Sequence, residues 1–525
     1  MLLIQNGILH TMDSNQPLFS ADLLIQNGKI AEIGERLSPI DGTHVIDAQG
    51  CHIYPGFIDA HSHIGLSQEK TTTSDESNEH TTPITPTMRA IDAINPMDSA
   101  FHNALAAGIT GVMAGPGSAN PIGGQFAFLK TAGRCVDDMV VMAPAAIKIA
   151  FGENPMTCYG ANGNTPATRM GIASMIREEL FRAKQYLQNQ ENTAKDFALE
   201  CYRPLFEKKI PLKAHVHRAD DIYTAIRIAR EFDLDLTLDH CTEGHLIAHE
   251  IAASGYPAIV GPSLASRSKN EVGLSDFKTP GILHKSGVTV ALTTDHPVSR
   301  IQYLPLCAAL AAKEGWDKHS ALKAITIDAA RICRVDHRLG SITVGKDADL
   351  AIFDGDPLEL STSLKATYIN GKQVWPGKPV RAVYAGQAVS HGPGRRLRQA
   401  HGHPLADQIR GAGQRLRQLA PPAAEQRQTP QCVPGRHPSA PPHGQDLSGT
   451  LPAAVQPRRH PDRPQEIGTA SGKTRSPRSE GQCIRGVQGT DYVYVSIFSI
   501  VIFWAAEINR NILGAKPKSS ALLVS

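Results

Sequence analysis

The stretch that decides the fold is Tyr54-Pro55-Gly56-Phe57-Ile58-Asp59-Ala60-His61-Ser62-His63. It is typical of a short buried strand that ends in two histidines one residue apart. Side chains at i and i+2 of a strand share a face, so His61 and His63 project to the same side, where two imidazoles can bind one metal ion. An isolated His-x-His pair is more often two loop histidines without a ligand, because short motifs match by chance. The rest of the chain must therefore support the metal interpretation.

Composition sets broad limits on the class of protein. The chain has 525 residues, enough for two or three domains, and a net charge of +3 that indicates no particular acidic partner. Its nine cysteines are scattered without a Cys-x-x-Cys pair, which favours reduced thiols and a cytoplasmic location. The N-terminus lacks the basic segment and the long apolar run of a signal peptide. We expect a small-molecule substrate, neither nucleic-acid nor membrane binding, and leave homo-oligomer formation open.

Related strand–turn units lie near the N-terminus and again more than three hundred residues later. Leu2 to Gly7 recurs as Leu23 to Gly28, and a related unit, Thr367 to Trp375, lies far downstream. Each unit is an apolar strand running into Asn-Gly, the strongest short hairpin signal. We therefore predict one small β-sandwich domain assembled from residues 1–54 and 341–384; two independent hairpins are the alternative.

Between these flanks, residues 55–340 alternate short apolar strands with helical patterns. The clearest helix is expected over Met170 to Gln188, and strands are expected at Ile109 to Ala114, Val140 to Ala143, Ile147 to Phe151, Leu212 to Val216, Asp235 to Asp239, Ala258 to Val260 and Val288 to Thr293. This alternation predicts an α/β fold with a (β/α)8 TIM-like barrel. A doubly wound open sheet is the alternative, but no GxGxxG follows the first strand. The segment Gly115 to Gln125 is expected to be a flexible loop that closes over the substrate.

The C-terminal segment has a different composition. From Ala385 to Asp491 there is no Phe, Tyr or Trp, and Arg, Pro, Gln and Gly dominate. Such a segment buries too little apolar area to offset its ordering entropy, so 385–525 is predicted to be a disordered, low-complexity tail. The abrupt change of composition motivates the hypothesis that this tail is a frameshift or read-through product.

Four further candidates for the site follow the histidine pair, each at or just past the end of an expected strand. They are Lys148, His215, His240 and Asp295. In a (β/α)8 barrel the C-terminal strand ends converge on one face, so residues far apart in sequence become neighbours. Several imidazoles with a carboxylate form a nitrogen and oxygen site that suits zinc, with iron, manganese or nickel as alternatives.

The set of motifs resembles the amidohydrolase superfamily, and within it the branch of imidazolonepropionases and prolidase-like dipeptidases. The motifs are PGFIDAHSH, KAHVH, LDH and TTDH, in that order over about residues 1–380. The resemblance implies that His61 and His63 from strand one bind the more buried metal. It implies further ligands in the order His215 from strand five, His240 from strand six and Asp295 from strand eight.

The number of metal ions depends on strand four. Lys148 matches the position that in some members of the superfamily is a carboxylated lysine bridging two metals, and an unmodified ammonium would repel a cation. Imidazolonepropionase-like members use one metal, and Glu153 is an alternative source of a carboxylate or a residue that contacts the substrate. His217 shares a strand face with His215, which is compatible with substrate contact and equally with plain packing.

These residue types predict a metal-dependent hydrolase that cleaves a C–N bond of an amide, cyclic amide or peptide-like substrate. A divalent metal lowers the pKa of bound water toward about 7. Asp295 is predicted to bind the metal, accept the proton of the water and pass it to the leaving nitrogen. The alternatives are a deaminase of an aminated ring and a non-catalytic scaffold with the same fold. The complete ligand set disfavours the scaffold.

Overall fold

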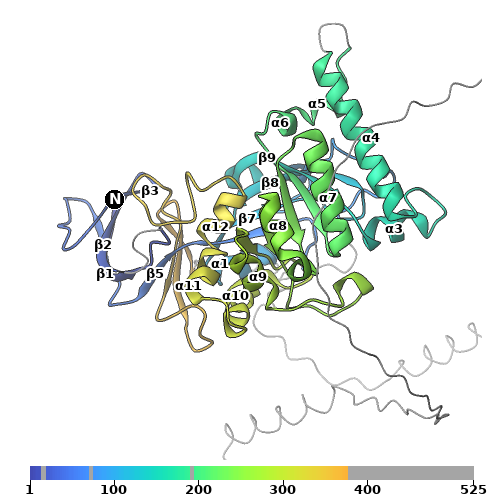
Figure 1. The fold of residues 1–525 in the computed structure, drawn as a ribbon. Helices are drawn as coiled ribbons and strands as arrows, with labels where there is room; N and C mark the ends of the chain where they lie inside the picture. Colours follow the sequence, from blue (N-terminus) through green and yellow to red (C-terminus); the bar gives the residue numbers. More distant parts are fainter. Residues whose placement is uncertain (14–18, 70–74, 190–193, 377–525) are drawn as a thin grey trace, which may run out of the picture. The chain divides into compact units, whose positions relative to one another are not determined.

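The computed structural model describes residues 1–13, 19–69, 75–189 and 194–376, all within a unit that ends at Gly394. Their strands form two eight-stranded sheets, one open and one curled into a nearly closed barrel surrounded by helices (Figure 1). This arrangement confirms the predicted fold class. The predicted tail at 385–525, and with it the frameshift hypothesis, lies outside the described residues.

The open sheet combines strands from both flanks of the barrel. Its order is β16-β15-β14-β5-β1-β2-β3, with β4 paired to β1, so the first strands (blue in Figure 1) lie beside the last ones (orange). The strands are β1 (Leu2–Leu9), β2 (Phe19–Gln26), β3 (Lys29–Gly34), β4 (His44–Asp47), β5 (His52–Pro55), β14 (Leu350–Phe353), β15 (Leu364–Ile369) and β16 (Lys372–Trp375). The domain boundaries at 54, 340 and 384 remain predictions.

Of the three Asn-Gly pairs in the flanking strand–turn units, two form the hairpin turns expected of them. Asn27-Gly28 joins β2 to β3 and Asn370-Gly371 joins β15 to β16, and all four residues have positive φ, as a type I′ turn requires. The hairpin prediction is wrong at Asn6-Gly7, where β1 continues and its register against β2 shifts. The Asn6 backbone N–H donates to Asp22 at 3.0 Å, so a β-bulge forms there instead of a turn.

The barrel strands follow one another in chain order around the sheet. They are β6 (Phe57–Ser62), β7 (Ile109–Ala114), β8 (Ile122–Lys130), β9 (Val140–Ala150), β10 (Leu212–Val216), β11 (Leu236–His240), β12 (Ala258–Val260) and β13 (Val290–Leu292). Adjacent strands are parallel except that β8 runs antiparallel to both β7 and β9.

Strand β8 differs from the sequence-based expectation. The loop expected over Gly115 to Gln125 ends at Asn120-Pro121, and Ile122 begins a strand that is buried along its whole length. The glycines that suggested a loop allow close backbone packing instead, since a Cβ on Gly124 would lie 2.4 Å from the carbonyl oxygen of Met88. Glycine in a buried strand therefore concealed the strand from the sequence pattern.

Helices pack around the barrel strands. They are α1 (Ser99–Leu105), α2 (Val136–Met139), α3 (Glu153–Gly160), α4 (Arg169–Gln188), α5 (Phe197–Glu200), α6 (Arg203–Phe206), α7 (Ala219–Phe232), α8 (Ala248–Ser254), α9 (Thr279–Lys285), α10 (Leu304–Lys313), α11 (Lys318–Lys323) and α12 (Ile327–Ile332). Short 3-10 turns lie at η1 (Ala90–Asp92), η3 (Gly244–Ile247), η4 (Asn270–Val272) and η5 (Ile301–Tyr303). Helix α7 packs on β10 and β11, and α4 packs on α7. Helix α4 matches the helix expected over Met170 to Gln188.

Hydrogen bonds connect the first barrel strand to the segment that follows the last one. The buried Asp59 carboxylate accepts from the Thr294 backbone N–H at 3.1 Å and from the Thr294 hydroxyl at 2.6 Å. The backbone N–H of His63 donates to the carbonyl oxygen of His296 at 2.9 Å. These bonds place the end of β6 beside the segment that follows β13.

A buried ion cluster joins the barrel to the open sheet. Lys130, at the end of β8, donates to Asp347 at 2.9 Å, Asp349 at 3.0 Å and Asn370 at 2.6 Å. Burial raises the pKa of Asp349, so its charged form depends on Lys130. Lys29, whose side chain is 53% exposed, bonds to the same Asp347 from the surface at 2.9 Å.

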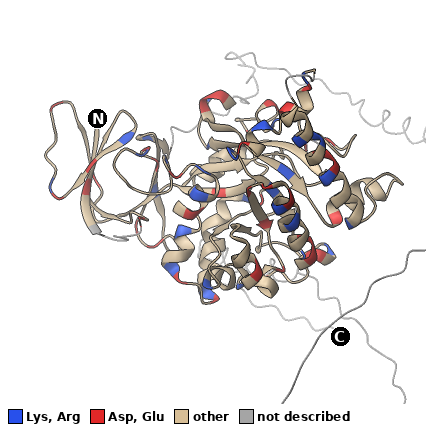
Figure 2. Cartoon of the chain, turned by 45° about the horizontal axis from the view of Figure 1, so that its top comes forward, with Lys and Arg blue, Asp and Glu red and all other residues tan. Residues whose placement is uncertain are grey.

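Charged residues of both signs are interspersed over the helices and loops (Figure 2). In the described ranges, none of the helices combines the length and the apolar character needed to cross a membrane.

Replacing Lys130 with methionine is expected to lower the free energy of unfolding by about 3–5 kcal/mol, because it leaves the buried carboxylate of Asp349 without its cation, whereas Asp347 keeps Lys29 and Arg338. Lys29→Met, which removes an exposed partner of the same Asp347, is the matched control and should cost less than about 1 kcal/mol. Urea unfolding followed by circular dichroism measures both. Equal, small shifts of the two midpoints would show that the cluster does not hold the barrel to the sheet.

Candidate active site at the rim of the barrel

The first cluster of side chains joins the two ends of the barrel. His61 and His63 come from the end of β6, and Asp295 follows β13 by three residues. The Asp295 Oδ1 atom lies 3.4 Å from His61 Nε2 and 3.2 Å from His63 Nε2. Ligand atoms from all three residues lie within 4.8 Å of one another, a spacing that allows them to hold one metal ion.

The second cluster contains three buried imidazoles. His215 lies in β10, His217 directly after it, and His240 ends the neighbouring strand β11. Their ring centroids are 4.5–4.8 Å apart, and their ligand atoms also lie within 4.8 Å of one another. His61 and His240, one from each cluster, have ring centroids 5.0 Å apart, so the two clusters adjoin.

Hydrogen bonds at the outer ring nitrogens orient these imidazoles. The Nδ1 atom of His63 lies 2.7 Å from the carbonyl oxygen of Gly115, and that of His240 lies 2.7 Å from the carbonyl oxygen of Gly261. A carbonyl oxygen only accepts, so Nδ1 carries the proton in both rings and Nε2 presents its lone pair to the cluster. The Nδ1 atom of His61 makes the equivalent contact with Asp239 at 2.8 Å. Partners of this kind fix the tautomer and direction of metal-binding histidines.

Three buried atoms of the clusters lack a hydrogen-bond partner among the described residues. They are Nε2 of His215, Nε2 of His240 and Oδ1 of Asp295. Leaving a buried acceptor without a partner is costly, and such groups call for an explanation. Divalent cations bound in the two clusters would satisfy all three, so the donor set fits a metal centre.

The electrostatics favour ligand-competent protonation states. Burial holds the pKa values of His215 and His217 well below their usual value, which keeps both imidazoles neutral. Burial alone would raise the pKa of Asp295, but the neighbouring His240, His61 and His63 hold it well below its usual value, so this carboxylate is ionised. Neutral imidazoles and an ionised carboxylate are the forms that bind metals.

Two lysines are buried beside the clusters. The Nζ atom of Lys148, on β9, lies 3.4 Å from Nε2 of His61, and burial lowers the pKa of Lys148 to about 8. Lys213, on β10, donates to the carbonyl oxygen of Ala60 at 3.0 Å and contacts Asp239 at 3.3 Å. Lys148 therefore faces the first cluster, whereas Lys213 is paired behind it.

Two of the candidate ligands have an unusual backbone conformation. His240 has φ 76° and Asp295 has φ 50°, in the left-handed region that non-glycine residues seldom adopt. Both stand where a strand ends and the chain turns into a loop. Such conformations persist where the surrounding structure imposes them, and they concentrate at functional sites.

A pocket of about 370 Å³ opens over the clusters. Its walls include His63, His215, His217 and Asp295, and this volume lies within the range of small-molecule sites. Glu153, the alternative strand-four ligand, begins α3 and belongs to neither cluster of the described residues; its backbone N–H donates to Glu271 at 2.8 Å.

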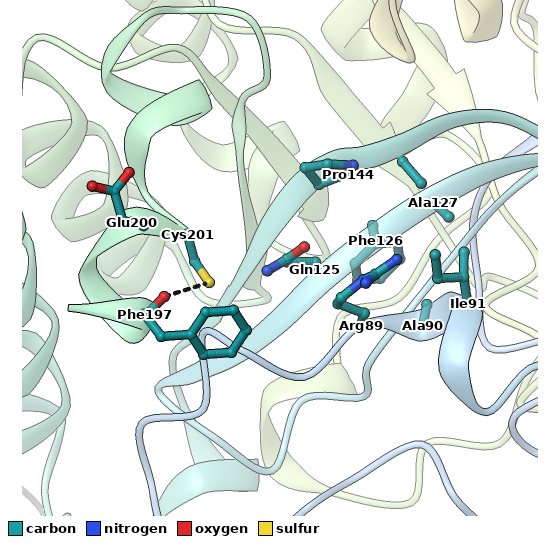
Figure 3. A pocket seen from close by; sticks show the side chains of 11 residues that line it. Arg89, Ala90, Ile91, Gln125, Phe126, Ala127, Pro144, Phe197, Glu200 and Cys201 are labelled. Atoms are coloured by element: carbon teal, nitrogen blue, oxygen red, sulfur yellow. Dashed lines mark hydrogen bonds between the residues drawn. The ribbon is translucent and has the colours of Figure 1, made fainter. Parts of the chain in front are cut away.

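Figure 3 shows a second pocket, of about 330 Å³, next to β8, β9 and α5. Arg89, Gln125, Pro144 and Cys201 line it, and the Cys201 thiol donates to the carbonyl oxygen of Phe197 at 3.4 Å. No member of the two histidine clusters lines this pocket, so it is separate from the candidate site.

Sequence reasoning missed the charged residues that support the clusters. Lys213 stands two residues before His215 on a buried strand, so its side chain lies on the same face, one layer further into the barrel. A lysine within an apolar strand is rare, and this could have identified Lys213 from the sequence. Asp239 directly precedes the candidate ligand His240 in an apolar strand, and this too could have identified it from the sequence. Glu271 and Lys269 lie in a polar loop segment that has the composition of an ordinary surface loop, so the sequence carried no signal for them.

Comparison with known proteins now identifies the class of protein. The model of the amidohydrolase family matches residues 52–374, more than half of the chain. The chain therefore belongs to the amidohydrolase family, as its motifs predicted.

Similarity to individual proteins is less extensive. Amidohydrolase tasK of Hapsidospora irregularis is 27% identical over 391 residues, which cover 67% of this chain and 39% of tasK. D-hydantoinase of Geobacillus stearothermophilus is 46% identical over 74 residues, 14% of this chain and 15% of that protein. The chain thus matches less than half the length of either relative.

The crystal structure of an amidohydrolase from Thermotoga maritima MSB8 is 39% identical, with a TM-score of 0.69, over 71% of this chain and 100% of that chain. It supports the superfamily assignment, and the imidazolonepropionase and prolidase-like branch stays a prediction.

Replacing Asp239 with asparagine is expected to weaken the binding of a divalent metal by about 10–100-fold, because His61 loses the carboxylate that orients it. Zinc affinity measured by competition with a chelator tests this. Thr237→Val is the matched control, because the Thr237 hydroxyl donates to the same carboxylate at 3.1 Å without contacting a histidine. Unchanged zinc affinity in a folded Asp239→Asn protein would refute the orienting role.

Proposed function

We propose that this chain is a metal-dependent hydrolase that cleaves a C–N bond of an amide, cyclic amide or peptide-like small substrate. The observation that carries the proposal is the set of buried, unpartnered ligand atoms of His215, His240 and Asp295 beneath an open pocket. Membership of the amidohydrolase family supports it. Relatives named D-hydantoinase and dihydroorotase support a cyclic amide among these substrates.

In this proposal the two clusters hold a divalent metal centre. His61, His63 and Asp295 would hold one ion, and His215 and His240 would hold a second. Zinc suits these nitrogen and oxygen donors, and iron, manganese and nickel are alternatives. His217 lies within the second cluster and also lines the pocket, so it is placed either to add a ligand or to contact the substrate.

Lys148 is proposed to connect the two ions after carboxylation. Its neutral amine adds to carbon dioxide, a C–N bond forms, one proton is released, and the carbamate carries a negative charge. Burial lowers the pKa of this amine to about 8, which makes the neutral form accessible near neutral pH. Without this modification the ammonium repels a cation, and the site would hold one ion.

In this proposal the metal ion and the side chains have separate roles in the reaction. When bound, a divalent metal lowers the pKa of its water and polarises the substrate carbonyl. The ionised Asp295 accepts the proton of the attacking water and returns it to the leaving nitrogen. The neutral imidazoles bring no positive charge of their own, and burial of the ligands limits access by bulk water.

We also propose a cytoplasmic location. The seven described cysteines, from Cys51 to Cys333, are all unpaired, in keeping with a reducing compartment.

The zinc-loaded protein is expected to hydrolyse at least one member of a panel of hydantoins, dihydropyrimidines, N-acyl amino acids and dipeptides. Asp295→Asn should slow turnover by about 10³-fold while most of the zinc is retained, because the histidines remain. Substrate loss and zinc content measure the two effects, and Asp92→Asn, at a surface position, is the control. Near-normal turnover in Asp295→Asn would exclude the proton-transfer role. Ammonia release from aminated rings without amide cleavage would favour a deaminase.

Lys148→Met is expected to reduce the metal content from two zinc ions per chain to one, since the bridging carbamate is lost. Zinc per chain is measured by mass spectrometry after reconstitution in bicarbonate buffer and gel filtration. Lys184→Met, on the outer helix α4, should keep two ions. If Lys148→Met binds as much zinc as the wild type, the bridging role is wrong.

A further inference from the structure

The loop between β12 and α9 brings an ion pair to the wall of the pocket. The Nζ atom of Lys269 donates to Glu271 Oε1 and to Asn154 Oδ1, both at 2.7 Å. The side chain of Glu271 is 1% exposed, whereas that of Lys269 is 25% exposed and lines the pocket. The buried carboxylate therefore fixes an ammonium group that remains open to a ligand.

Glu271 places this ammonium close to the second cluster. Its Oε1 atom, which accepts from Lys269, lies 3.9 Å from Nε2 of both His215 and His217. Its Oε2 atom accepts from the Glu153 backbone N–H at 2.8 Å. A Cβ on Gly152, whose φ is 82°, would lie 2.3 Å from that oxygen, so glycine is required at this position.

Asn154 connects Lys269 to a second donor. Its amide nitrogen donates to Ser118 Oγ at 2.7 Å, so Ser118 accepts this bond and its own hydroxyl proton is left for another acceptor. An ammonium has three N–H donors, and Lys269 uses two of them on Glu271 and Asn154. Lys269 and Ser118, which both line the pocket, therefore each retain one donor.

Lys269 is the sole lysine or arginine among the described residues that line this pocket. The same loop contributes three serine hydroxyls to the wall, at Ser266, Ser268 and Ser275. Two carboxylates also line the pocket: Asp295, which belongs to the first cluster, and Asp75, whose Oδ1 atom accepts from the hydroxyls of Ser67 and Ser77. The one fixed cation, Lys269, has a free donor and suits a single anionic group with two oxygens. Hydrogen bonds between charged partners are stronger than neutral ones, so such a group would anchor the substrate.

We propose that Lys269 and Ser118 bind a carboxylate of the substrate, so that the preferred substrates are amides that carry a free carboxylate. This inference rests on the proposed function, because it places the scissile amide at the metal centre. The carboxylate then sets the distance and orientation of the amide relative to His215 and His217. An uncharged amide of the same size enters the pocket without this anchor.

The test uses metal-chelating probes, so it does not require a known substrate. The probes are the monohydroxamates of succinic, glutaric and adipic acid, each compared with the matched compound whose distal carboxylate is a carboxamide. Isothermal titration into the zinc-loaded full chain measures their affinities. The wild type should bind the best carboxylate probe about tenfold or more tightly than its carboxamide partner.

Variants assign this preference to the proposed residues. Lys269→Met should abolish it, Ser118→Ala should reduce it without leaving a buried charge unpaired, and Lys269→Arg should retain most of it. Lys278→Met, an exposed lysine of the same loop, is the matched control and should behave as the wild type. Zinc content and thermal unfolding check that each variant is folded.

The possible failures are distinct. Equal binding of carboxylate and carboxamide probes by the wild type, or an unchanged preference in both Lys269→Met and Ser118→Ala, overturns the carboxylate assignment and leaves the proposed function standing. If no hydroxamate binds and the folded wild type retains no zinc, the metal centre is absent and both proposals are wrong.

Discussion

The Asp59 carboxylate provides the hydrogen bonds on which the site depends. By accepting from the backbone and the hydroxyl of Thr294, it joins the first barrel strand to the segment after the last one. His61 and His63 follow Asp59 in the chain, and Asp295 follows Thr294. The contact that brings the barrel ends together therefore also assembles the first ligand cluster. Residues more than two hundred positions apart become neighbours because their backbones are bonded here.

The backbone of the fold also determines how the imidazoles are oriented. Backbone carbonyls at Gly115 and Gly261 fix the rings of His63 and His240, and both carbonyls belong to loops that leave barrel strands. The rings are thus positioned by the fold and not by flexible side chains. The left-handed backbone at His240 and Asp295 is likewise imposed by the surrounding structure, so the fold fixes the positions of these side chains.

Charge is arranged in two zones around the clusters. Behind them, Asp239 is paired with both His61 and Lys213 in the buried interior. On the pocket side, Glu271 is paired with Lys269, which remains partly exposed. Each of these two buried carboxylates has a lysine partner, which offsets the cost of burying its charge. The inner pair orients His61, a proposed metal ligand, whereas the outer pair presents a positive charge to whatever enters the pocket.

The sequence by itself determined the architecture and the identity of the candidate ligands. Apolar strands alternating with helices predicted the barrel, and His61, His63, Lys148, His215, His240 and Asp295 were named because each stands near a strand end, where barrel topology brings strand ends together. The antiparallel strand β8 was hidden, because its glycines, of which Gly124 packs against Met88, look like loop residues in a sequence. Only the tertiary structure decided that His217 joins the ligand cluster, that Glu153 stands apart from it, and that Glu271 and Lys269 reach the site. Those positions follow from loop conformations, and loop conformation depends on long-range contacts that no local periodicity encodes.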